Sequence, residues 1–91
     1  MLTHRQQQTL LAIQAYQRDN GGVSPTVRDV AEAIGAAGQM NRTLGLRAGL
    51  EERGFIRRHP GRHRAIEVLR PIPIARVFRF NDATKSLEPL P

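Results

Sequence analysis

The sequence predicts a mainly α-helical fold followed by a β-hairpin, and two patterns carry this prediction. Apolar residues recur every three or four positions up to Gly54, which is the period of helices buried on one face. Beyond Gly54, apolar and charged residues alternate, which is the period of a strand. With 91 residues the chain has room for one small domain and a tail, and 4% aromatic residues imply an aliphatic core.

The first helix is expected from about His4 to about Arg18. Thr3 and Gln6 have the spacing of a capping box, in which two side chains bond free N–H groups at a helix start. Apolar residues follow at spacing three. The Asp-Asn-Gly-Gly at 19–22 then ends the helix, because glycine adopts the left-handed conformation common at helix ends.

A second, shorter helix is expected from its N-cap Thr26 to Gly35. Asp29 falls in the first turn, where a negative charge is favourable. The apolar residues between 27 and 34 fall at i, i+3, i+4 and i+7 and therefore share one face.

A third helix is expected from its N-cap Asn41 to Arg53, after a turn at 36–40 and before a stop at Gly54. Its apolar stripe is imperfect. Arg47 lies beside this stripe, where an aliphatic residue is expected.

The hairpin is expected from strands at 55–59 and 64–69, joined by a turn at 60–63. The tail, residues 71–91, begins with prolines at 71 and 73, which we interpret as excluding a helix there. A short strand at 74–80, a turn at Asn81-Asp82 and a loose end from Thr84 to Pro91 are expected after them.

Positive charge is concentrated in one segment. The formal net charge is +6, and residues 53–70 contribute +5 of it through six arginines and one glutamate. Arginine suits bidentate contacts with phosphate or guanine, although an arginine-rich codon bias explains the excess of Arg over Lys equally well. Codon bias does not explain the clustering, so this segment is expected to meet an acidic partner.

Three helices and a hairpin in this order form a winged helix-turn-helix, which we assign to residues 1–70. In helix-turn-helix proteins the second helix of the pair enters the major groove of double-stranded DNA with its N-terminal residues at the base edges. The matching candidates are Gln39, Asn41, Arg42, Thr43 and Gly45.

Alternatives remain open for the residues of this third helix. Gln39 and Asn41 serve equally well as caps, and Arg42 as a solvated surface arginine. Gly45 and Gly49 either allow close approach to DNA or to another helix, or are tolerated in a helix held by tertiary contacts.

The hairpin, or wing, is expected to meet phosphates or the minor groove, the alternative being a solvated basic face. Its candidates are Arg57, Arg58, Arg62, His63 and Arg64, with His59 beside them. Further phosphate contacts are expected from the start of the second helix, at Thr26 and Arg28, and from Arg5.

Other function classes find no support in the sequence. The chain has no cysteine and no long apolar run, so we expect no disulfide, no Cys-ligated zinc and no membrane span. We expect no catalytic residues, no metal site and no cofactor. The alternative to DNA binding is a protein-interaction module that binds another regulator or RNA polymerase.

Several segments resemble the N-terminal DNA-binding domain of the LexA family, the SOS-response repressors. The similar segments are the opening at 2–7, Gly22 to Thr26, Leu50 to Arg58, and Arg64 to Leu69. The resemblance implies a winged helix-turn-helix that binds an inverted-repeat operator as a cytoplasmic, bacterial or phage, nucleoid-associated repressor.

The chain also departs from the family. Residues 36–49 match poorly, so a different sequence specificity is expected. The family's serine peptidase domain is not found, and Lys85 is the only lysine, so we expect a stand-alone domain. A homodimer or cooperative binding on DNA is expected, with residues 72–80 of the tail as the candidate dimerisation segment.

Overall fold

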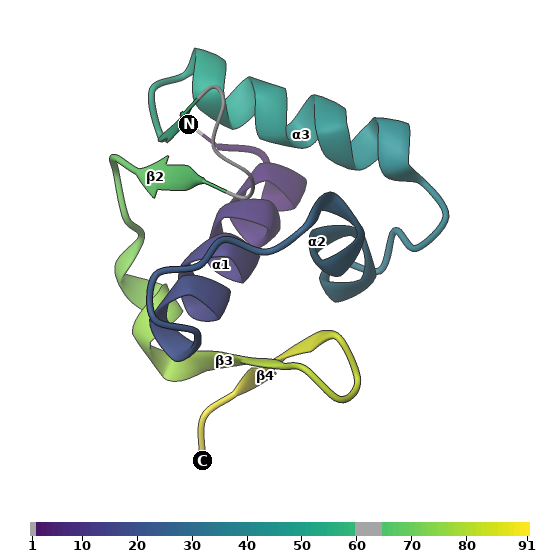
Figure 1. Cartoon of the computed structure of the whole chain (residues 1–91), viewed down its shortest axis with the longest axis vertical. Coiled ribbons are helices and arrows are strands. Elements are labelled where there is room, and N and C mark those ends of the chain that lie inside the picture. Colours follow the sequence, from purple (N-terminus) through teal and green to yellow (C-terminus); the bar gives the residue numbers. More distant parts are fainter. Residues whose placement is uncertain (1, 60–64) are drawn as a thin grey trace.

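The computed structural model describes residues 2–59 and 65–91. Its helices are α1 (His4–Asp19), α2 (Val27–Ala33) and α3 (Met40–Glu52). Two antiparallel hairpins follow, β1 (Ile56–Arg58) with β2 (Ile66–Val68) and β3 (Phe78–Asn81) with β4 (Ser86–Pro89), separated by the 3-10 helix η1 (Pro73–Val77). In Figure 1, α1 lies between α3 on one side and the β3–β4 hairpin on the other. The predicted winged helix-turn-helix is therefore confirmed.

Two capping boxes set the starts of α1 and α2. Gln6 donates its backbone N–H to Thr3 Oγ1 over 3.1 Å, and Thr3 returns its own N–H to Gln6 Oε1 over 3.1 Å. Thr26 and Asp29 exchange the same two bonds at α2, over 3.1 and 3.3 Å. Both helices begin where the sequence predicts, because these signals are local.

The start of α3 corrects the prediction. The helix begins at Met40, so the N-cap is Gln39, and Asn41 lies inside the first turn. The Gln39 carbonyl accepts the backbone N–H of Thr43 over 3.1 Å, while no side chain caps this end. The expectation that Asn41 caps the helix is therefore wrong, because the backbone carbonyl of Gln39, two residues earlier, already accepts the first helical hydrogen bond.

The β1–β2 hairpin is shorter than predicted, and it is fastened to the helices at Ile66. Ile66 donates its N–H to Ser24 Oγ over 2.9 Å, and its carbonyl accepts from Gln17 Nε2 over 2.6 Å. Gln17 Nε2 also donates to Ser24 Oγ over 3.0 Å. The wing therefore takes its position from α1 and from the connection between α1 and α2.

The tail corrects two further predictions. A five-residue 3-10 helix begins at Pro73, although the two prolines were expected to exclude a helix. Proline fits the first position of a short helix because its missing N–H would be unpaired there in any case. Residues from Thr84 onward are not a loose end, because Ser86–Pro89 pair with Phe78–Asn81 as β4.

The tail packs on the helices through both polar and apolar contacts. Ile72 exchanges two hydrogen bonds with the Gln14 side chain, and Arg18 donates to the carbonyls of Ala75 and Phe78. The Phe80 ring meets the Tyr16 ring edge to face, with centroids 5.1 Å apart. The tail is thus part of the folded unit on the side away from α3.

The core is aliphatic, as expected from the composition. Its largest fully buried members come from α1, α3 and β1, and are Leu10, Ile13, Leu50 and Ile56. Val30 and Ile34 of α2 join them in the same cluster. This core fixes the angle at which α3 and the wing are presented.

Candidate nucleic-acid interface

The N-terminal half of α3 presents polar side chains to solvent. Gln39, Asn41, Arg42 and Gly45 are all exposed, whereas Leu50 of the same helix is fully buried. Arg42 Nη1 lies 3.5 Å from Gln39 Oε1, so these two side chains are neighbours. The structure therefore brings four of the five predicted base-contacting residues onto one accessible stretch, free of the core.

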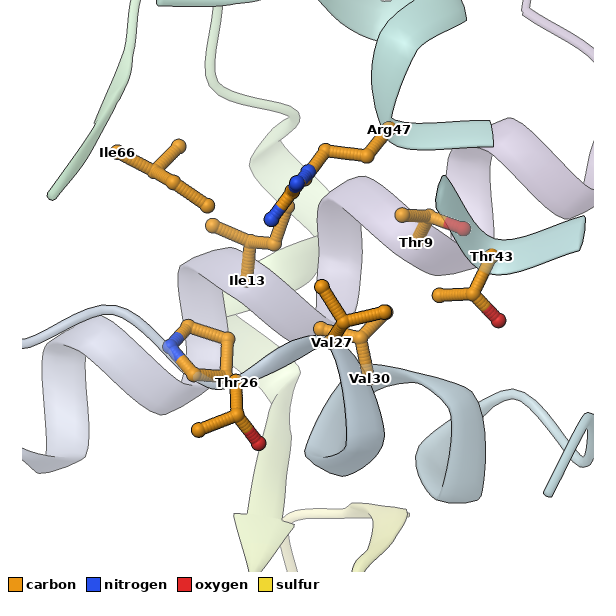
Figure 2. Close-up of a pocket in the computed structure, with 9 residues that line it drawn as sticks. Thr9, Ile13, Thr26, Val27, Val30, Thr43, Arg47 and Ile66 are labelled. Carbon is orange, nitrogen blue, oxygen red and sulfur yellow. The ribbon is translucent and has the colours of Figure 1, made fainter. Parts of the chain in front are cut away.

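Thr43 is placed apart from this group. It is 1% exposed, and its hydroxyl donates to the Gln39 carbonyl over 3.2 Å. Figure 2 shows its side chain among residues of α1 and α2, on the inner side of α3. Its bond steadies the first turn of α3.

The two glycines of α3 have different surroundings. A Cβ at Gly49 would stand 2.7 Å from Gln6 Nε2, so α1 approaches α3 closely there. A Cβ at Gly45 would meet nothing within 4 Å. At Gly49 the neighbour is therefore the end of the Gln6 side chain, while Gly45 has no neighbour at the position of a Cβ.

The described arginines of the wing form ion pairs with acidic side chains. Arg58 Nη2 lies 3.1 Å from Glu51 Oε1, and its N–H and Nε also donate to that carboxylate. Arg57 lies 3.8 Å from Glu67, which His59 also contacts at 3.2 Å. The hydrogen bonds from Arg58 hold the pKa of Glu51 below its ordinary value. Arg57, with an exposed side chain and a long contact, is the freer of the two cations.

The remaining predicted wing residues, Arg62, His63 and Arg64, lie outside the described residues. Their place in the interface rests on their position in the sequence between β1 and β2.

The predicted phosphate contacts differ in how free they are. Arg28 is exposed near the start of α2. Thr26 uses both its hydroxyl and its N–H in the capping box with Asp29. Arg5 donates to the Ile34 carbonyl at the end of α2, so only its other donors are available to a phosphate.

Arg47 is a charged residue that the predicted site does not contain. It lies on the inner side of α3 and lines a small cavity with residues of α1, α2 and β2 (Figure 2). Burial lowers the pKa of its guanidinium, and the nearby charge of Arg58 acts in the same direction. The sequence signal for it was a cation where the apolar stripe calls for an aliphatic residue.

Within residues 2–59 and 65–91, no helix has the length and apolar character needed to cross a bilayer.

A family model of the LexA DNA binding domain matches residues 1–65. The chain belongs to this family. The matched range contains α1, α2, α3 and β1, together with the exposed stretch of α3. Among the described elements, the tail hairpin β3–β4 lies beyond the LexA match.

Similar relatives carry the same family name. The LexA repressor of Novosphingobium aromaticivorans is 44% identical over 70 residues, which are 77% of this chain and 29% of that protein. The LexA repressor of Frankia alni is 41% identical over 70 residues, 77% of this chain and 27% of that protein. The LexA repressor of Acidiphilium cryptum is 42% identical over 72 residues, which are 77% of this chain and 29% of that protein.

The chain spans less than a third of the length of these curated LexA relatives. The part that matches the family model is a DNA-binding domain, and it contains α3 and the first strand of the wing, β1. These matches do not favour the alternative function, a protein-interaction module.

Proposed function

We propose that the chain binds double-stranded DNA sequence-specifically and acts as a transcriptional repressor through a non-catalytic winged helix-turn-helix. The observation that carries the proposal is the orientation of α3. This helix buries Leu50 and Thr43 while it leaves Asn41 and Arg42 exposed beside a basic wing. Membership of the LexA DNA-binding family supports the same conclusion.

The proposed roles follow from side-chain chemistry. Arg42 bonds guanine through two parallel N–H groups, and Asn41 or Gln39 bonds adenine. Gly45 allows the DNA backbone to approach α3 closely. Arg57 and Arg58, with Arg62, His63 and Arg64 of the wing, hold phosphates or the minor groove.

Contacts at the phosphates fix the register of the protein on the duplex. We assign these to Arg28, to the free donors of Arg5 and to the backbone near Thr26. Such contacts raise affinity for all sequences alike and make it depend steeply on salt.

We further propose an inverted-repeat operator bound by two copies, in the cytoplasm and on the nucleoid of a bacterium. One domain offers a single reading helix, and a symmetric pair presents two helices about one turn of DNA apart. Because residues 36–49 differ from the family pattern, the operator sequence is expected to differ as well.

Selection of bound sequences from a random duplex pool tests the function directly. We expect one enriched motif, repeated in inverted orientation. Equal recovery of all sequences, or affinity unchanged between low and moderate salt, would sink the proposal.

Two substitutions distinguish a residue that recognises bases from a residue that binds the DNA backbone. Arg42→Ala should lower the affinity for the selected site by about 1–3 kcal/mol and leave random DNA nearly unaffected, because it removes a base contact. Arg57→Ala, the matched control, should weaken both kinds of DNA alike. Titrations of both variants on selected and scrambled duplexes at fixed salt give the comparison.

A further inference from the structure

Arg47 has no role in the arrangement described so far, and its position is unusual for a cation. It faces the same side of α3 as the buried Thr43 and Leu50. The residues that line its cavity are neutral, and include Ile13, Val27 and Ile66. Figure 2 shows the guanidinium extending between Ile66 of β2 and the start of α2.

The guanidinium has no hydrogen-bonded or ion-paired partner within the described chain, and the attraction of Glu51 does not offset the effects of burial and Arg58 on its pKa. Among residues 2–59 and 65–91, no group accepts a hydrogen bond from Arg47 or forms an ion pair with it. Glu51, one turn further along α3, is held by Arg58 at 3.1 Å. Placing a charge against apolar groups is costly unless an opposite charge meets it.

The missing anion has to reach Arg47 from outside. The cavity beside the guanidinium measures about 10 Å³, which is room for about one water molecule and not for a phosphate or carboxylate. No unbonded polar side-chain atom of the described non-exposed residues is sealed from solvent, so the Arg47 donors reach the surface.

The surface at this point is bordered by the elements that carry the proposed interface. Pro25, Thr26 and Val27 at the start of α2, Ile66 of the wing and Arg47 of α3 line the same cavity. In the proposed DNA complex, a strand that contacts both α3 and the wing would pass this junction. Its phosphodiester carries two non-bridging oxygens, which a planar guanidinium can bind with two parallel N–H bonds.

We propose that Arg47 binds a DNA backbone phosphate at the junction of α3, α2 and the wing, and so fixes the angle between the reading helix and the wing. This inference rests on the proposed DNA binding. The phosphate supplies the counter-charge that Arg47 lacks in the free protein. The contact is sequence-independent and is made only in the complex.

The proposal predicts opposite effects on stability and on binding when the charge is removed. Arg47→Met keeps an unbranched side chain about as long as the aliphatic stem of arginine and removes the cationic head group. We expect a higher melting temperature, because the charge is no longer placed against apolar residues. We expect the affinity for every duplex to fall by about 10- to 100-fold, since a charge-assisted bond is lost.

Salt dependence gives a readout that a structural role would not change. Each neutralised phosphate contributes about 0.9 to the slope of log affinity against log salt. Arg47→Met should lower the slope by about that amount, and Arg47→Lys should retain it because the charge stays. The control Arg79→Met removes an equal charge from β3, on the side of the molecule away from α3, and should leave the slope unchanged.

Melting curves and DNA titrations at several salt concentrations decide between the outcomes. A slope for Arg47→Met equal to that of the parent would overturn the proposal, as would a slope for Arg47→Lys lowered as much as that for Arg47→Met. A melting temperature raised by inorganic phosphate in the parent but not in Arg47→Met, with DNA binding unaltered, would instead assign the site to a free anion. A parent protein without salt-dependent DNA binding would refute the proposed function itself.

Discussion

At the scale of single residues, the two glycines of α3 make the clearest contrast. Both weaken a helix, by about 1 kcal/mol each relative to alanine. Only Gly49 has a local reason, because a Cβ there would stand 2.7 Å from Gln6 Nε2. Gly45 is exposed and a Cβ there would meet nothing within 4 Å, so no contact within the described protein requires glycine at this position.

Gly45→Ala should therefore stabilise the free protein by up to about 1 kcal/mol, through the gain in helix propensity. It should also weaken DNA binding if the backbone approaches Gly45. Urea denaturation and a DNA titration on the same variant measure both effects. Gly49→Ala is the matched control, with a smaller gain because the Gln6 side chain must move; tighter DNA binding by Gly45→Ala would contradict the assigned role.

Thr43, compared with Arg42 and Asn41, shows what residue patterns can and cannot predict about the site. Chemistry alone placed Thr43 among the base-contacting residues, and the rotation of α3 about its axis turned it inward. That rotation depends on where the helix begins, which no side-chain cap signals. The exposed positions of Arg42 and Asn41 were predictable, since neither fits the apolar stripe.

At the scale of elements, those that depend on local signals could be predicted from the sequence, and those that depend on tertiary contacts could not. The starts of α1 and α2 were predictable because each capping box is contained within four residues. The β3–β4 hairpin was not. Its turn places Lys85 at φ 55°, a conformation that usually signals itself through glycine or asparagine, and β4 contains a proline. Burial of Phe80 and Leu87 against the helices holds this hairpin together.

An ion pair links this hairpin to α2. Lys85 Nζ lies 3.3 Å from Asp29 Oδ1, and Asp29 also closes the capping box of α2. Burial alone would raise the pKa of Asp29, but the hydrogen bonds from Thr26 and the charge of Lys85 outweigh it and lower that pKa. The carboxylate form is therefore favoured in the folded state.

The lowered pKa of Asp29 fixes the direction of a pH effect. Its contribution to stability is complete above the ordinary pKa of 3.8 and is lost as the pH falls through the lower folded value. Asp29→Asn should cost up to about 1 kcal/mol at neutral pH, and the difference from the parent should shrink at pH 3. Urea denaturation at both pH values measures this, with Lys85→Met as the control that keeps the capping box. An equal difference at both pH values would exclude the charge as the cause.

At the scale of the whole molecule, the proposed DNA-binding face and the tail lie on opposite sides. Figure 1 places α3 across one side of α1 and the β3–β4 hairpin across the other. The tail covers Ala15 and Tyr16 with Phe80, yet it leaves an apolar group exposed, made of Ile74, Val77 and Leu90. A surface away from the DNA that still exposes apolar residues suits contact between two copies on one operator.

Removal of the whole tail is a poor test of that contact, because it also uncovers the aromatic pair of Tyr16 and Phe80. Introducing a single charge on the exposed apolar group is a more specific test. Val77→Asp should abolish self-association and cooperative binding to an inverted repeat while it leaves the affinity for one half-site unchanged, because an unpaired carboxylate would be buried between the copies. Val23 is 47% exposed, as is Val77, so Val23→Asp is the matched control and should keep self-association. Sedimentation equilibrium and titrations on half and full sites measure both; cooperative binding that survives Val77→Asp would remove the tail from the interface.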